Sequence, residues 1–193
     1  LEKYLTGDDG IKIKPRVLFE GGLRIDKITD KLDEVGDETK KKEIKLVGVH
    51  VGSADFPYDG LEDQELKLGQ YLGQLMEIDR ACPGVSIVIC SIPLRIQHYP
   101  SQLQKNINDQ IQGFNIKLKE IADRSPRIRF CNTFPYLADK DGPSPALYRM
   151  QETDPNGVHL NQTGKQELAK AIAEEVKSIV RQRSADQAVV QGE

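Results

Sequence analysis

Short apolar runs rich in β-branched residues alternate along this chain with longer stretches of helical periodicity. The runs are 11–19 (IKIKPRVLF), 44–51 (IKLVGVHV), 85–92 (VSIVICSI) and 128–134 (IRFCNTF). The proline in the first run favours an edge strand. The second and third runs are almost continuously apolar, which is typical of strands covered by helices on both faces. Strands that alternate with helices predict a parallel sheet with right-handed crossovers.

The helical stretches lie between and after these runs. Apolar residues recur at helical spacing over 25–32, 61–81, 103–122 and 162–183. Asn161, directly before the last stretch, is of a residue type that commonly caps helices. The sequence therefore predicts an α/β fold of three layers, with helices on both faces of a mostly parallel sheet.

The length of 193 residues predicts one domain, 1–183, followed by a polar C-terminal tail, 184–193. A net charge of −3 argues against a nucleic-acid surface. The mean hydropathy of −0.51 and the lack of a long apolar run or signal-peptide pattern predict no membrane span and an intracellular protein. Three cysteines without a CxxC pair, and no phosphate- or dinucleotide-binding glycine pattern, predict no metal and no cofactor.

Candidate site residues follow the predicted strands, because ligands of open parallel sheets bind beyond the carboxyl ends of the strands. The four segments in these positions are 21–22 (GG), 52–55 (GSAD), 93–95 (PLR) and 154–161 (DPNGVHLN). The sequence predicts that they form one cleft.

The motifs, in order, are a Gly-Gly turn, HVGSAD after a buried strand, SIPLR, a helix with FNxxL, and GVHLNQTG before the last helix. This order resembles the SGNH (GDSL-type) hydrolase family, including the esterase-like domains of animal retroelements. The resemblance covers about 19–179. It implies hydrolysis of acyl esters, in which a Ser attacks, a His acts as base, an Asp orients the His, and a Gly and an Asn help to bind the oxyanion.

The residues of this sequence match these roles only in part. Gly21 or Gly22 matches the oxyanion glycine, and His159 matches the base. Ala54 stands where the family has the oxyanion asparagine. Asn156 stands where the family has the orienting aspartate. The resemblance therefore implies a site with altered catalytic motifs.

Three further residues are candidates for the same cleft. Asp154 lies two residues before Asn156 and is an alternative partner for His159, although Pro155 stiffens the link. Ser53 ends a predicted strand and is expected to line the cleft. Arg95 is expected at the cleft rim, as a ligand-binding or surface cation.

No segment matches the family's GDS nucleophile. The first residues, 1–5 (LEKYL), look like the end of the helix that follows that Ser, so the family's first strand is expected to be missing or displaced. It either lies upstream or is permuted to 188–193 (AVVQGE), which otherwise belongs to the tail.

Two hypotheses remain open. The first is a non-catalytic binding or interaction module that has lost the Ser, Asn and Asp roles and binds a small-molecule or acylated ligand, or a protein partner. The alternative is an acyl or acetyl ester hydrolase whose Ser lies on a segment outside this sequence. A nucleic-acid-associated role rests on the retroelement analogy alone.

Overall fold

The computed structural model describes residues 5, 23–56, 63–96, 102–150, 152–155 and 157–191, with 38, 39, 102–104 and 184–191 described by their backbone only. Its elements, in chain order, are η1 (Ile25–Lys27), α2 (Asp30–Asp33), α3 (Glu38–Glu43), β1 (Leu46–Val49), η2 (Ser53–Asp55), α4 (Gln64–Ala81), β2 (Ser86–Cys90), α5 (Gln102–Asp123), β3 (Ile128–Cys131), α6 (Phe134–Leu137), β4 (Ala138–Asp139), β5 (Gly142–Pro143), η3 (Pro145–Leu147) and α7 (Gln162–Gln191).

A parallel sheet in the order β1–β2–β3 forms the centre of the described structure. Leu46 of β1 pairs with Ser86 of β2, and Cys90 of β2 pairs with Cys131 of β3. These strands confirm the last three predicted runs, although each is shorter than its run. The predicted strand 11–19 lies outside the described residues.

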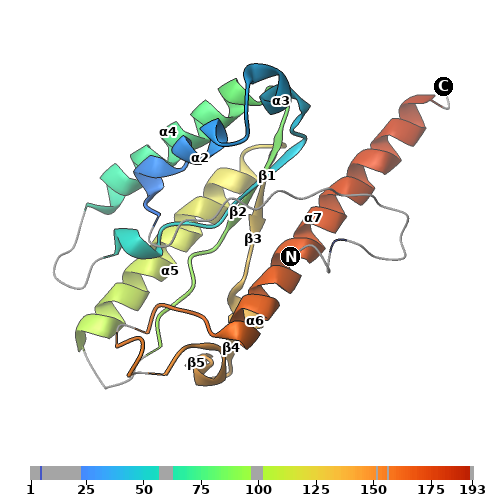
Figure 1. Cartoon of the computed structure of the whole chain (residues 1–193). Helices are drawn as coiled ribbons and strands as arrows, with labels where there is room; N and C mark the ends of the chain where they lie inside the picture. The colour runs from blue at the N-terminus through green and yellow to red at the C-terminus, as the bar shows by residue number, and fades with distance from the viewer. Residues whose placement is uncertain are drawn as a thin grey trace.

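Helices cover both faces of this sheet. Helices α4 and α5 lie on one face, and α7 lies on the other (Figure 1). Side chains alternate along a strand, so Ile87 and Ile89 of β2 enter the core beneath α4 and α5, while Val88 and Cys90 pack beneath α7. Every residue of β2 is buried. The three-layer α/β architecture predicted from the sequence is therefore confirmed.

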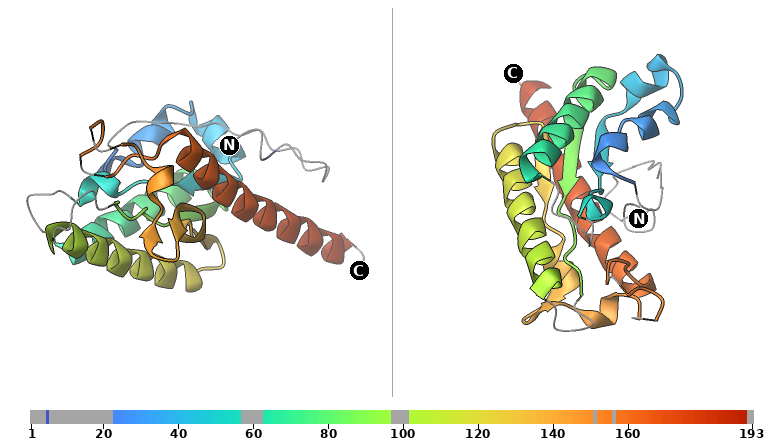
Figure 2. Two further views of the ribbon diagram at one scale, coloured as in Figure 1. Left: turned by 90° about the horizontal axis from the view of Figure 1, so that it is seen from below. Right: turned by 90° about the vertical axis from the view of Figure 1, so that its left-hand side faces the viewer.

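The last helix is longer than the sequence predicted. Residues 184–191, which we expected to form a polar tail, continue α7, and this C-terminal end of the helix extends away from the rest of the molecule (Figure 2). The prediction was wrong because no Gly or Pro occurs between Gly164 and Gly192, and good helix formers fill the interval. The permuted strand considered for 188–193 is also wrong over 188–191, which is helical.

Side-chain caps fix two helix starts. Asn161 accepts a hydrogen bond from the N–H of Gly164 at 3.0 Å, which confirms the predicted cap of α7. Asp63 accepts bonds from the N–H groups of Glu65 and Leu66, so α4 begins three residues after the predicted start. Across the described residues, no helix combines the length and apolar character needed to cross a bilayer.

Candidate functional site

The loop that leaves β1 turns sharply at Gly52 before it enters η2. Gly52 has a φ of +115°, and a Cβ atom there would lie 2.5 Å from Cδ1 of Ile92. A larger residue would be strained in this backbone conformation and would also meet Ile92. Gly52 therefore lets the loop pass close to the chain that leaves β2. Ser53 and Ala54 follow in η2, and both are half-buried.

Asp55 anchors this loop to the start of η1. Its buried carboxylate accepts a hydrogen bond from the N–H of Ile25 at 2.9 Å. The Nε atom of Arg24 lies 3.5 Å from it, and the buried Nζ atom of Lys67 lies 3.8 Å from it. Two cations and a backbone donor balance the desolvation of the buried carboxylate. The sequence reasoning did not single out Asp55, although it ends the GSAD motif.

Arg95 lies elsewhere than we expected. It is buried, and its guanidinium donates hydrogen bonds to the backbone carbonyls of Ser53, at 3.1 Å, and Phe56. The predicted position at the cleft rim is therefore wrong. The chain around Arg95 is itself held by α5, which brings the guanidinium beneath the loop after β1. Arg95 thus positions Ser53 and Ala54.

Two asparagines of α5 hold the chain that continues from β2. Asn115 accepts from the N–H of Ile92 at 2.8 Å and donates to its carbonyl at 2.9 Å. Asn108 binds the N–H and carbonyl of Arg95 in the same way, both at 2.9 Å. Each amide takes the place of a neighbouring strand, so the backbone groups of this segment are satisfied without one. Sequence reasoning identified Asn115 only as part of the FNxxL pattern and did not identify Asn108.

The loop before α7 brings an aspartate and a histidine together. Nδ1 of His159 lies 3.0 Å from Oδ1 of Asp154, and the backbone N–H of His159 donates to Oδ2 of Asp154 at 2.6 Å. The Asp154 side chain is 3% exposed, whereas the His159 side chain is 62% exposed. Among the candidates that the structure describes, Asp154 is the residue that contacts the imidazole of His159.

A tight turn explains why Asp154 reaches His159. The N–H of Gly157 donates to the carbonyl of Asp154 at 3.0 Å, which closes a four-residue turn with Pro155 in its second position. Proline is favoured in this position because its φ is already fixed there. We had expected Pro155 to hinder the approach of Asp154 to His159. Pro155 instead favours the turn that brings His159 back to the carboxylate of Asp154.

The hydrogen bond to Asp154 determines which imidazole nitrogen can act as a base. An imidazole that donates from Nδ1 to a carboxylate carries its free lone pair on Nε2. The carboxylate also stabilises the imidazolium that forms when Nε2 accepts a proton. Asp154 and His159 therefore have the arrangement of a general base and its orienting acid.

The loop after β1 and the loop before α7 both contact the segment that follows β2, and they do so at the consecutive residues Arg95 and Ile96. Arg95 binds the first loop, and the N–H of Ile96 donates to the carbonyl of Gly157 at 3.1 Å. Gly157 has a φ of +60°, and a Cβ atom there would lie 2.3 Å from the carbonyl oxygen of Ile96. Ser53 and His159 thus belong to neighbouring loops at the carboxyl ends of the strands.

Gly21, Gly22 and Asn156 lie outside the described residues. Within the described part of the chain, Ser53 makes no hydrogen bond with His159, and no cluster of His, Cys, Asp and Glu residues could hold a metal ion.

Solved structures from bacteria share this architecture. A Streptococcus pneumonia protein provisionally described as a platelet activating factor superposes with a TM-score of 0.63 at 21% identity, over 80% of this chain and 68% of its own. A Bacteroides fragilis protein provisionally described as an acylhydrolase gives 0.62 at 13%, over 82% and 72%. A GDSL-like lipase from Bacteroides thetaiotaomicron gives 0.59 at 16%, over 82% and 73%.

The chain has the fold of the SGNH (GDSL-type) hydrolases. No protein-family model and no curated protein matches its sequence. At these identities the likeness establishes the fold alone. The loop after β1 carries Ser53 and Ala54, and the loop before α7 carries Asp154 and His159.

Proposed function

We propose that this chain carries the base of an acyl- or acetyl-ester hydrolase site, in which Asp154 orients His159. The hydrogen bond between Oδ1 of Asp154 and Nδ1 of His159 is the observation that supports this proposal. It leaves the exposed imidazole with Nε2 available to a hydroxyl group. The SGNH-type fold and the position of both residues before α7 support the same reaction.

In this reaction, Nε2 of His159 takes the proton of a serine hydroxyl while the serine oxygen attacks the ester carbonyl. The proton then passes from Nε2 to the leaving alcohol, and the acyl group remains on the serine. Water, deprotonated by the same nitrogen, releases the acid. The proposal requires a serine supplied by a segment outside this sequence.

Ala54 sets an upper limit on the proposed activity. Its side chain has no donor for the oxyanion, in a position where the resemblance implies asparagine. Loss of one oxyanion donor costs about 3 kcal/mol, or roughly 10²–10³ in kcat. We therefore expect slow turnover.

A second candidate function is a non-catalytic module that binds an acylated ligand or a protein partner in the same cleft. Ala54 favours it, because a binding site has no need of an oxyanion donor. In that case, Asp154 serves only to close the loop through the backbone N–H of His159.

The experiment compares the chain with the complete polypeptide, using fluorophosphonate labelling and turnover of short-chain aryl esters. If the proposal is correct, the complete polypeptide labels, His159→Ala abolishes turnover, and Asp154→Asn lowers it about 10²- to 10⁴-fold. His50→Ala is the control, because it removes a histidine that lies outside the proposed pair of Asp154 and His159. A folded complete polypeptide that neither labels nor turns over would exclude the hydrolase and favour the binding module.

A further inference from the structure

A separate cavity opens at the carboxyl ends of β2 and β3, beside α5. It has a volume of about 350 Å³, and neither His159 nor Asp154 lines it. Open α/β sheets bind ligands at this edge, in pockets of about 300–1,000 Å³. The cavity therefore has the position and size of a ligand site.

The cavity lies on the opposite side of the His159 loop from the imidazole. Tyr148 lines the cavity and forms an antiparallel bridge with Leu160. Leu160 packs with Tyr148 and Leu137 on the cavity side. Adjacent residues of an extended segment point to opposite sides, so the side chain of His159 points away. A ligand in this cavity would not contact the proposed base.

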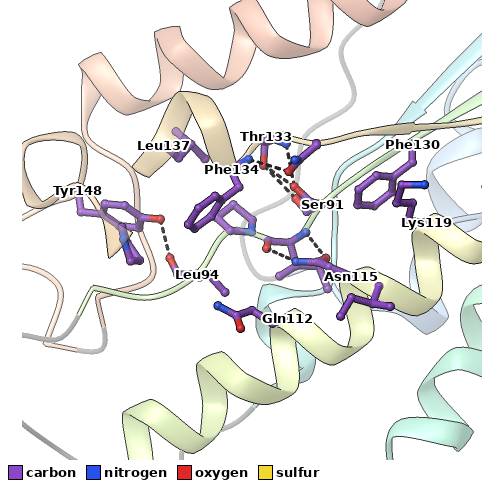
Figure 3. A pocket seen from close by; sticks show the side chains of 15 residues that line it. Ser91, Leu94, Gln112, Asn115, Lys119, Phe130, Thr133, Phe134, Leu137 and Tyr148 are labelled. Carbon is purple, nitrogen blue, oxygen red and sulfur yellow. Dashed lines mark hydrogen bonds between the residues drawn. The ribbon is translucent and has the colours of Figure 1, made fainter. Parts of the chain in front are cut away.

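The polar groups on the cavity floor are already paired within the protein. The hydroxyls of Ser91 and Thr133 share a hydrogen bond of 2.7 Å, and the Tyr148 hydroxyl donates to the carbonyl of Leu94 at 2.5 Å (Figure 3). The amide of Asn115 is engaged by the backbone of Ile92. A floor whose donors and acceptors are satisfied favours an apolar ligand body.

Lys119 lies at one end of the lining, far from Leu137 and Tyr148. Figure 3 shows Lys119 beside Phe130 at one end, and Leu137 with Tyr148 at the other. Among the described residues that line the cavity, Lys119 is the one charged side chain. Its present partner is Asp123, at 2.5 Å, and both side chains are more than half exposed. Such surface ion pairs are weak, so an anionic ligand can compete for Lys119.

We propose that this cavity is a second ligand site, which binds a linear amphipathic carboxylate with its chain against Leu94 and Leu137 and its head group at Lys119. A volume of about 350 Å³ holds roughly a dozen non-hydrogen atoms at about 30 Å³ each. Octanoate is of this size. Ile116 and Phe134 extend the apolar lining to the surface, where they are 60% and 39% exposed.

Titration of the chain with octanoate and with 1-octanol, followed by amide NMR shifts, tests the site. We expect saturable octanoate binding, with shifts centred on 91–94 and 112–119. Lys119→Gln should weaken octanoate binding about two- to fivefold and leave octanol binding unchanged. Asp123→Asn should tighten octanoate binding, because it frees Lys119. Gln112→Trp should block both ligands, because Gln112 is an exposed residue of the lining.

The matched control is Lys105→Gln, an exposed lysine of the same helix that does not line the cavity. It should leave both affinities unchanged. His159→Ala should also leave octanoate binding unchanged, so this test is independent of the proposed hydrolysis. The proposal would be overturned if Lys119→Gln and Lys105→Gln changed the octanoate affinity equally. It would also be overturned if the octanoate shifts failed to saturate, or if they were centred on other residues.

Discussion

Replacing Asn108 by alanine should destabilise the fold strongly, because Asn108 satisfies both backbone groups of Arg95. Its amide makes two hydrogen bonds of 2.9 Å to that N–H and carbonyl, and the residue is 9% exposed. A buried backbone group left without a partner costs about 1–3 kcal/mol. Two such groups give a loss of about 2–6 kcal/mol in the free energy of unfolding.

Urea denaturation followed by circular dichroism would measure this loss. In thermal unfolding of a chain of this length, about 2–4 °C of Tm accompanies each kcal/mol, so Tm should fall by roughly 4–24 °C. The control is Gln112→Ala, at an exposed position of the same helix, which should change stability by no more than about 0.5 kcal/mol. A loss below about 1 kcal/mol for Asn108→Ala would refute the view that α5 replaces a strand partner here.

Three further outcomes are expected. Gly157→Ala should lower stability by about 2 kcal/mol or more in a thermal unfolding assay, since its Cβ would meet the carbonyl of Ile96 at a positive φ; an unchanged Tm would contradict this backbone geometry. Lys67→Met should cost about 3 kcal/mol in urea unfolding, because it removes a buried cation beside the buried Asp55; a neutral effect would mean that the pair is not buried as described. The three thiols should react slowly with an aromatic disulfide in the native protein and quickly after unfolding, because all three are buried. The hydrogen bond to Cys131, together with burial, also raises the pKa of Cys90. Fast labelling of the native protein would refute this prediction.

The sheet could be predicted from the sequence because its strands are buried on both sides. The apolar run of β2 has no polar face, and this occurs when helices cover both faces of a sheet. The end of α7 could not be predicted in the same way. Half of residues 184–191 (SADQAVVQ) are polar, and the sequence does not distinguish a helix that extends from the molecule from a tail.

The sequence identified candidate residues but not the contacts that they make. His159 was identified by the motif before α7, and Asp154 only as an alternative, because its contact with the imidazole depends on the turn around Pro155. Arg95 and Asn108 act on backbone groups far away in the sequence. Such single contacts leave no periodic pattern, so a sequence without its fold does not reveal them.

The tautomer of His159 tests the central claim most directly, namely that Asp154 holds Nδ1 and leaves Nε2 as the base. The chain has three histidines, so long-range ¹H–¹⁵N correlation spectra of the imidazoles can be assigned with His→Ala variants. We predict that neutral His159 carries its proton on Nδ1, and that Asp154→Ala shifts it to the Nε2–H form favoured by a free imidazole. An Nε2–H tautomer in the unmodified chain, or a spectrum unchanged by Asp154→Ala, would contradict the assignment of Asp154 as the orienting acid.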